Sequence, residues 1–167
     1  KDRGRIFIKP VSDPEDTDRA VERLKRVFGI VSLSRVVMVE KDLDTIKRTA
    51  LEMVRKRSPG SFKVESRRAD KSFPISSPEI CRLVGGFILK NSEGIKVDVH
   101  RPDLMINIEI RDKAYIFAGM EKGSGGLPTG TGGKGLLLLS GGIDSPVAGW
   151  MVAKRGVELE AGRFLSL

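Results

Sequence analysis

The residues best suited to chemistry in this sequence are six consecutive ones, 140–145, with the order Ser-Gly-Gly-Ile-Asp-Ser. They follow an apolar run, residues 136–139, of the kind found in parallel strands buried on both faces. In an open α/β sheet, anions bind between such a strand and the N-terminus of the next helix. The two glycines permit a close backbone approach, and the hydroxyls and successive N–H groups can donate to phosphate oxygens. The pattern therefore predicts a phosphate-binding loop.

One residue of this loop, Asp144, carries a negative charge where a phosphate would bind. A carboxylate is favourable there if Mg²⁺ bridges it to the phosphates, so we expect Mg²⁺ together with a nucleotide. No group of residues suggests a metal site built by the protein alone. The pattern Gly130-x-Gly132-x-x-Gly135 matches a dinucleotide fingerprint, but it precedes its strand, and Pro128 breaks a Walker A pattern. We interpret these glycines as part of a flexible linker.

A concentration of positive charge predicts a second function. The formal net charge is +8, and residues 55–71 contain seven basic and two acidic side chains. Such a concentration favours a polyanionic partner, usually nucleic acid, and the alternative is a solvated charged surface. We predict that Arg67, Arg68 and Lys71 bind phosphates and that the ring of Phe73 stacks on an unpaired base.

Two further reactive side chains are predicted to have no catalytic role, Cys81 as a structural residue and His100 as a structural or surface residue. Cys81, the single cysteine, excludes a disulfide framework and lies in an apolar helical pattern without an evident base. His100, the single histidine, has no evident catalytic or metal-binding partner. No apolar run reaches the roughly 18 residues of a membrane span, and neither Met nor an apolar leader opens the sequence. We expect a soluble cytoplasmic protein with further residues before Lys1.

The spacing of apolar residues predicts the elements that carry these side chains. A strand is expected at 5–9 and a second strand at 36–39. Between them, an acidic opening at 13–18 leads into a helix with apolar positions from Ala20 to Phe28, which is expected to end at Gly29. An α-β-α-β-β-β module should follow, with Asp42 and Ser77 as helix N-caps and strands at 61–66, 95–99, 104–110 and 114–118. Gly85 and Gly86 lie within its second helix, where each glycine lowers helix stability by about 1 kcal/mol relative to alanine. Close packing or an approaching RNA backbone would explain glycines at these positions.

The end of the chain predicts the start of another domain. Eight of residues 119–135 are glycine, which indicates a linker. A strand at 136–139, a helix to Gly156 and a strand at 157–164 form the first β-α-β of a doubly wound domain. We predict an α+β fold with four parts, residues 1–40, 41–118, 119–135 and 136–167.

At the loop, the sequence resembles the PP-loop ATP pyrophosphatases. Four further stretches, residues 62–71, 84–86, 102–103 and 127–131, resemble a THUMP domain that leads into a PP-loop. With Ala-Lys-Arg-Gly at 153–156, the chain is similar to the tRNA 4-thiouridine synthetase family, also called thiamine-pathway sulfurtransferases. The resemblance implies that the four parts are the C-terminal half of a ferredoxin-like domain, a THUMP RNA-binding domain, a Gly-rich linker and a truncated PP-loop domain.

The resemblance also implies a reaction. ATP adenylates the 4-oxygen of a uridine near the tRNA elbow, and persulfide sulfur displaces AMP to give 4-thiouridine. It implies binding of the tRNA acceptor end and elbow, a cysteine desulfurase as sulfur donor, sulfur transfer to the thiamine thiazole and a possible homodimer. The pyrophosphate would bind to Ser140, Gly141, Gly142, Asp144 and Ser145, with Asp144 as the catalytic residue. The adenine would lie against Leu138, Leu139, Arg163 and Phe164, although Gly162-Arg163 departs from the family's usual strand end.

Two alternatives stay open at this point. One is a non-catalytic THUMP module that binds RNA. The other is a different THUMP enzyme such as a methyltransferase, which is disfavoured because no Gly-rich loop suited to S-adenosylmethionine follows a strand. The family's persulfide-bearing cysteines belong to later parts of the PP-loop domain. We therefore expect the chain as given to bind tRNA without thiolating it.

Overall fold

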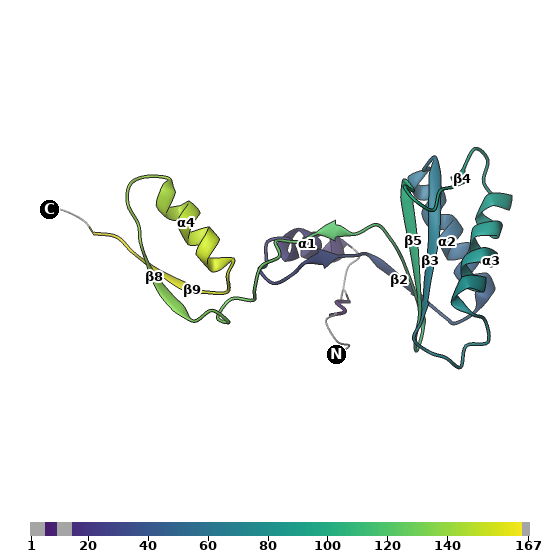
Figure 1. The fold of residues 1–167 in the computed structure, drawn as a ribbon, viewed down its shortest axis with the longest axis horizontal. Helices are drawn as coiled ribbons and strands as arrows, with labels where there is room; N and C mark the ends of the chain where they lie inside the picture. The colour runs from purple at the N-terminus through teal and green to yellow at the C-terminus, as the bar shows by residue number, and fades with distance from the viewer. Residues whose placement is uncertain (1–5, 10–14, 165–167) are drawn as a thin grey trace. The chain divides into compact units, whose positions relative to one another are not determined.

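The computed structural model describes residues 6–9 and 15–164, with the side chains of 15 and 16 left aside. The described residues form two compact units. One unit consists of residues 34–120, and the other combines residues up to Leu33 with those from Glu121 onward (Figure 1).

The 34–120 unit is a five-stranded sheet covered on one face by two helices, as Figure 1 shows. The strand order is β2-β6-β5-β3-β4, with β3 parallel to β4 and β5 and with β6 antiparallel to β5 and β2. The strands are β2 (Val36–Val39), β3 (Ser61–Arg68), β4 (Lys96–Val97), β5 (Leu104–Ile110) and β6 (Ala114–Ala118). The helices are α2 (Leu43–Arg57) and α3 (Ser77–Lys90). The predicted element order is thereby confirmed, although β4 is shorter than the strand expected at 95–99.

Both helices begin at side-chain caps. Asp42 accepts a hydrogen bond from the Thr45 N–H at 2.8 Å, as its predicted capping role requires. The cap of α3 is Ser76, which has an extended backbone and accepts from the Glu79 N–H at 3.4 Å. The prediction of Ser77 as the cap was wrong by one residue, because Ser77 already belongs to the helix.

The core of this unit lies between the sheet and its two helices. Every second residue of β5 and β6 faces the helices, so that Ile106, Ile108 and Ile116 are buried. The helices contribute one apolar face each, with Ile46, Ala50, Val54, Ile80, Val84 and Ile88 buried. The first and last strands of the unit, β2 and β6, are neighbours in the sheet. Its two ends are also close, since the Ser34 hydroxyl donates to the Gly119 carbonyl at 3.3 Å.

The other unit contains one helix and two small sheets. The helix α1 (Glu15–Leu24) is followed by β1 (Ser32–Leu33), which pairs antiparallel with β7 (Glu121–Lys122). The expected helix to Gly29 ends earlier, because residues 25–28 form turns. Residues 6–9 form no strand, and Arg5 of the strand expected there lies outside the described residues.

The predicted β-α-β arrangement follows in the same unit. It consists of β8 (Lys134–Leu138), α4 (Asp144–Ala153) and β9 (Glu158–Gly162), with β8 and β9 parallel. Leu137 lies against Gly149 of α4, whereas Leu136 and Leu138 are 67% and 55% exposed. The strand expected to be buried on both faces is thus covered on one. Within the described parts of the chain, no helix has the length and apolar character to cross a membrane.

Candidate functional site

The predicted phosphate loop connects β8 to α4 and is closed by its two serines. The Ser140 N–H donates to the Ser145 hydroxyl at 3.2 Å, and the two hydroxyl oxygens also lie 3.2 Å apart. The Gly142 N–H points back to the Ser140 hydroxyl at 3.4 Å. These contacts bring the two ends of the six-residue motif together, as the hypothesis of a loop that surrounds one small group requires.

The loop is open to solvent, since residues 140–144 are all exposed. A Cβ atom at Gly141 would have no neighbour within 4 Å, and one at Gly142 would meet only the Ser140 hydroxyl at 3.8 Å. Ile143, the residue before α4, supplies no side-chain cap. Pro146 has no N–H and the Val147 N–H donates to the Ile143 carbonyl at 3.4 Å, so Asp144 and Ser145 supply the amides of the first turn that are left for another acceptor. An open loop with uncapped amides at a helix N-terminus suits an anion such as phosphate.

Asp144 is exposed on the first turn of α4, where its carboxylate has no hydrogen-bond or ion-pair partner among the described residues. Nowhere in the described residues do three His, Cys, Asp or Glu side chains gather to hold a metal. A metal ion at this position would therefore take most of its ligands from phosphate oxygens and water, as Mg²⁺ commonly does. The residues present fit Mg²⁺ only as a companion of a bound phosphate group.

The residues predicted to contact the adenine lie beside the loop. Leu138 pairs with Gly162 across the two strands, and the Leu139 N–H donates to the Gly162 carbonyl at 2.8 Å. Arg163 and Phe164 follow directly, and both are exposed. The strand ends and the loop therefore share one edge of the β8–β9 sheet.

The four residues predicted to bind RNA have different surroundings. Arg67 and Lys71 are exposed. Arg68 is half-buried, and its guanidinium donates to the carbonyls of Phe73 at 2.7 Å and Ile75 at 3.2 Å. Arg68 thus supports the loop that leads into α3, and Arg67 and Lys71 are the members of the set with open side chains.

The predicted stacking role of Phe73 needs correction. Its ring is 8% exposed and belongs to the core between the sheet and the helices. A base cannot lie on it in this conformation. The spacing from the arginines suggested a surface ring, but an aromatic side chain gains more from burial when the loop folds back over the core.

Sequence reasoning missed Asp70, which fixes the same loop. Its carboxylate accepts from the Lys41 ammonium at 2.6 Å and from the N–H and hydroxyl of Ser72. The hydrogen bonds from Lys41 and Ser72 hold the pKa of Asp70 well below its usual value. The Asp-x-Ser spacing is typical of a turn in which the carboxylate accepts the N–H two residues on, so it could have revealed this anchor.

Cys81 and His100 both lie in the 34–120 unit. Cys81 is partly buried in α3, and burial raises the pKa of its thiol, which disfavours the reactive thiolate. His100 is exposed in a turn where its backbone N–H donates to Asp98 at 2.9 Å.

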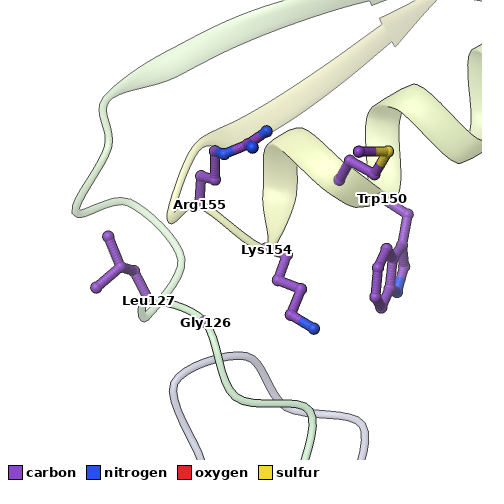
Figure 2. A pocket seen from close by; sticks show the side chains of 6 residues that line it. Gly126, Leu127, Trp150, Lys154 and Arg155 are labelled. Carbon is purple, nitrogen blue, oxygen red and sulfur yellow. The ribbon is translucent and has the colours of Figure 1, made fainter.

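A shallow pocket of about 380 Å³ lies at the other end of α4 from the loop (Figure 2). Its lining consists of Gly126, Leu127, Trp150, Met151, Lys154 and Arg155. In Figure 2 the side chains of Trp150 and Lys154 extend to the same side from the end of the helix. The Lys154 ammonium lies 4.8 Å from the centre of the Trp150 ring. This pocket is separate from the predicted phosphate site.

Comparisons with known proteins match the whole arrangement. The ThiI ferredoxin-like domain matches residues 1–34, the THUMP domain matches 40–118, and the thiamine biosynthesis protein (ThiI) family matches 130–166. A probable tRNA sulfurtransferase of Caldanaerobacter subterraneus subsp. tengcongensis is 50% identical over 166 residues, which are 99% of this chain and 43% of that protein. The chain therefore spans less than half the length of this curated relative.

Two solved structures have the same fold. The crystal structure of a 4-thiouridine synthetase–RNA complex with bound ATP has a TM-score of 0.83 and 40% identity, over 94% of this chain and 41% of that one. The structure of PH1313 from Pyrococcus horikoshii has a TM-score of 0.79 and 43% identity, over 87% of this chain and 51% of that one. Both structures share the mixed α/β fold of this chain, in which residues 40–118 match the THUMP domain. Over the residues that it spans, the chain matches the THUMP domain and the two ThiI models and is similar to curated tRNA sulfurtransferases, which confirms the resemblance and the α+β fold class.

Proposed function

We propose that the protein to which this chain belongs is a tRNA uridine 4-sulfurtransferase. The observation that carries the proposal is the open loop 140–145 at the N-terminus of α4, in a chain that also matches a THUMP domain. A relative with 40% identity was crystallised with RNA and ATP. The proposed product is 4-thiouridine, and the same sulfur transfer would serve thiamine thiazole synthesis.

The loop is proposed to bind the pyrophosphate part of ATP. The amides of Gly141, Asp144 and Ser145 would donate to phosphate oxygens, because a Cβ at Gly141 would meet nothing within 4 Å and no side chain caps the helix. Leu138, Leu139, Arg163 and Phe164 would contact the adenine, since the two strand ends reach the same edge. Mg²⁺, when bound with the nucleotide, would supply positive charge that neutralises the phosphates.

Asp144 is the proposed catalytic residue. Its exposed carboxylate stands at the mouth of the loop, where it would hold the phosphate-bound Mg²⁺ in place. The uridine 4-oxygen would attack the α-phosphorus while pyrophosphate leaves. The terminal sulfur of a persulfide would then displace AMP from the ring, and a second thiol would cleave the remaining S–S bond, which releases 4-thiouridine and leaves a disulfide between the carrier and that thiol. The persulfide is proposed to come from a cysteine desulfurase, because Cys81, the single cysteine of this chain, has a raised thiol pKa and lies in the other unit.

The THUMP unit is proposed to bind tRNA through its exposed cations. Arg67 and Lys71 are open to solvent next to a loop fixed by Arg68 and Asp70, so phosphate contacts would cost little ordering of the backbone. We propose the acceptor end and elbow of tRNA as the bound regions, the cytoplasm as the location and a homodimer as a possible assembly.

The test is pyrophosphate release from ATP with tRNA by the full-length protein, beside filter binding of the tRNA. Asp144→Ala should abolish release and leave tRNA affinity nearly unchanged, because the loop and the THUMP match lie in different units. Glu160→Gln, an exposed carboxylate of β9, is the control and should retain release. Undiminished release by Asp144→Ala would refute the mechanism.

Absence of release by the native protein, with tRNA binding retained, would favour the non-catalytic RNA-binding module. The 167-residue chain alone should bind tRNA without thiolating it, and thiolation by this chain would overturn that expectation.

A further inference from the structure

The Gly-rich segment predicted to be a flexible linker is hydrogen-bonded to the chain on both sides. Its first part pairs with the segment after α1. The N–H of Gly29 donates to the Gly125 carbonyl and the N–H of Gly125 to the Ile30 carbonyl, both at 2.8 Å. The Ser124 hydroxyl donates to the Lys25 carbonyl at 2.6 Å. Residues 123–133, called the strap below, are thus bound to the N-terminal part of the chain.

The second part of the strap is bound to the end of α4 and the start of β9. The Leu127 N–H donates to the Lys154 carbonyl at 3.0 Å, and the Gly132 N–H donates to the Gly156 carbonyl at 2.8 Å. The Glu158 N–H returns a bond to the Gly133 carbonyl at 2.8 Å. The strap therefore connects the segment after α1 to the helix that follows the phosphate loop.

Several glycines of the strap are required by close approach. A Cβ at Gly126 would lie 2.3 Å from the Lys154 carbonyl oxygen, and one at Gly123 would lie 2.3 Å from the Ile30 carbonyl oxygen. No side chain fits at such distances without moving the backbone. These glycines therefore allow two backbone segments to lie in contact, and they do not indicate a flexible segment.

The end of α4 has a second attachment through Trp150. The rings of Phe28 and Trp150 meet edge to face, with centroids 5.7 Å apart, and the Lys154 ammonium lies over the indole. In contrast, α4 is held loosely by its own sheet. All of its residues are described and only Gly149 is buried, whereas Val147 and Met151 are about half exposed.

We propose that Trp150 and Gly126 are positioning residues for the ATP loop, an inference that rests on the proposed function. The helix α4 has ten residues and is about 15 Å long, so it moves as a rigid rod. The strap and the Phe28–Trp150 contact fix one end of the rod, and Asp144 stands at the other. Releasing the fixed end lets the helix tilt on its small contact with β8 and β9, which displaces Asp144 and the amides of the first turn.

The first test uses the 167-residue chain and needs no ligand. Trp150 is its single tryptophan, so intrinsic fluorescence reports directly on this contact. Gly126→Ala is compared with Gly130→Ala. Both glycines have a positive φ, 79° and 90°, but a Cβ at 130 meets nothing within 4 Å. Gly126→Ala should shift Trp150 emission to longer wavelength and Gly130→Ala should not. Equal spectra would overturn the proposed role of the strap.

The second test measures pyrophosphate release by the full-length protein. Trp150→Ala should raise KM for ATP about two- to tenfold, the value of one aromatic contact, and leave KM for tRNA unchanged. Trp150→Phe keeps an aromatic ring toward Phe28, so its KM for ATP should lie much closer to the native value than that of Trp150→Ala. Met151→Ala, a neighbour that lines the same pocket, is the control and should keep the native KM.

The outcomes separate this proposal from the proposed function. A parallel loss in both KM values and kcat, or a Trp150→Phe variant no better than Trp150→Ala, would show a merely structural tryptophan and overturn the positioning role. A native protein that releases no pyrophosphate would refute the proposed function together with the positioning role. The fluorescence comparison would still decide whether the strap holds the end of α4, because it involves no ATP.

Discussion

Replacing Gly86 by Ala should stabilise the 34–120 unit. Gly86 lies inside α3 and is exposed, and a Cβ there would have no neighbour within 4 Å. Alanine should therefore add its full helix preference, about 1 kcal/mol, without any steric cost. For a unit of this size, about 1 kcal/mol corresponds to a rise of roughly 4–8 °C in the unfolding midpoint.

The assay is thermal unfolding followed by far-ultraviolet circular dichroism. Gly94→Ala is the matched control, because a Cβ there is equally free of neighbours but the backbone φ is +72°. That variant should lower the midpoint, since alanine is strained in the left-handed region. A Gly86→Ala midpoint at or below the native value would refute the assumption that nothing in the chain needs this glycine.

The same variant decides why the glycine pair is there. Close packing within the chain, one of the two explanations considered from the sequence, is wrong, because a Cβ atom at either Gly85 or Gly86 would meet nothing within 4 Å. The other explanation was an approaching RNA backbone. If Gly86→Ala raises the midpoint and weakens tRNA binding, an RNA contact explains the glycine. Unchanged tRNA binding would eliminate that explanation too.

Four further outcomes are expected. Arg67→Ala and Lys71→Ala should each weaken tRNA binding and reduce the log–log salt slope by about 0.7–0.9 in filter binding, and an unchanged slope would mean a merely solvated cation. Phe73→Ala should cost about 3–5 kcal/mol in urea unfolding because it empties a core position, and a cost below about 1 kcal/mol would contradict its burial. The pKa of Asp70 is lowered in the folded state, so its contribution to the free energy of unfolding is present above about pH 4, the unfolded pKa, and is lost as pH falls toward the folded pKa. Asp70→Asn should therefore flatten the acid side of the curve of stability against pH. A curve parallel to the native one would disprove this. Cys81 should react with iodoacetamide more slowly than a free thiol at neutral pH, because burial raises its pKa, and a rate equal to that of free cysteine would contradict this.

The sequence predicted the elements of the 34–120 unit well because their patterns are local. The alternation in β5 and the helical spacing in α2 each correspond to one kind of element. The position of Phe73 depended on how a loop folds over the core, which no local pattern records. The order of residues 140–145 predicted a loop between a strand and a helix, which the structure has between β8 and α4, whereas the helix start at Asp144 after the uncapped Ile143 could be seen only in the structure.

The strap shows a different limit of sequence analysis. Glycine is favoured both in flexible linkers and where two backbones must touch, so composition alone does not separate the two cases. The distinction requires knowing that Gly126 faces the Lys154 carbonyl and that Gly123 faces the Ile30 carbonyl. Both contacts join residues far apart in the sequence.

The pairing of β2 with β6 has a consequence for how this architecture can be rearranged. The first and last strands of the 34–120 unit are neighbours, and Ser34 bonds directly to Gly119. Immediately outside them, β1 pairs with β7. The unit is therefore a cassette inserted between two paired strands, and chains with adjacent termini tolerate excision and transplantation. A two-residue turn joining Leu33 to Glu121 would close β1 and β7 into a hairpin, and the excised cassette would keep its whole core.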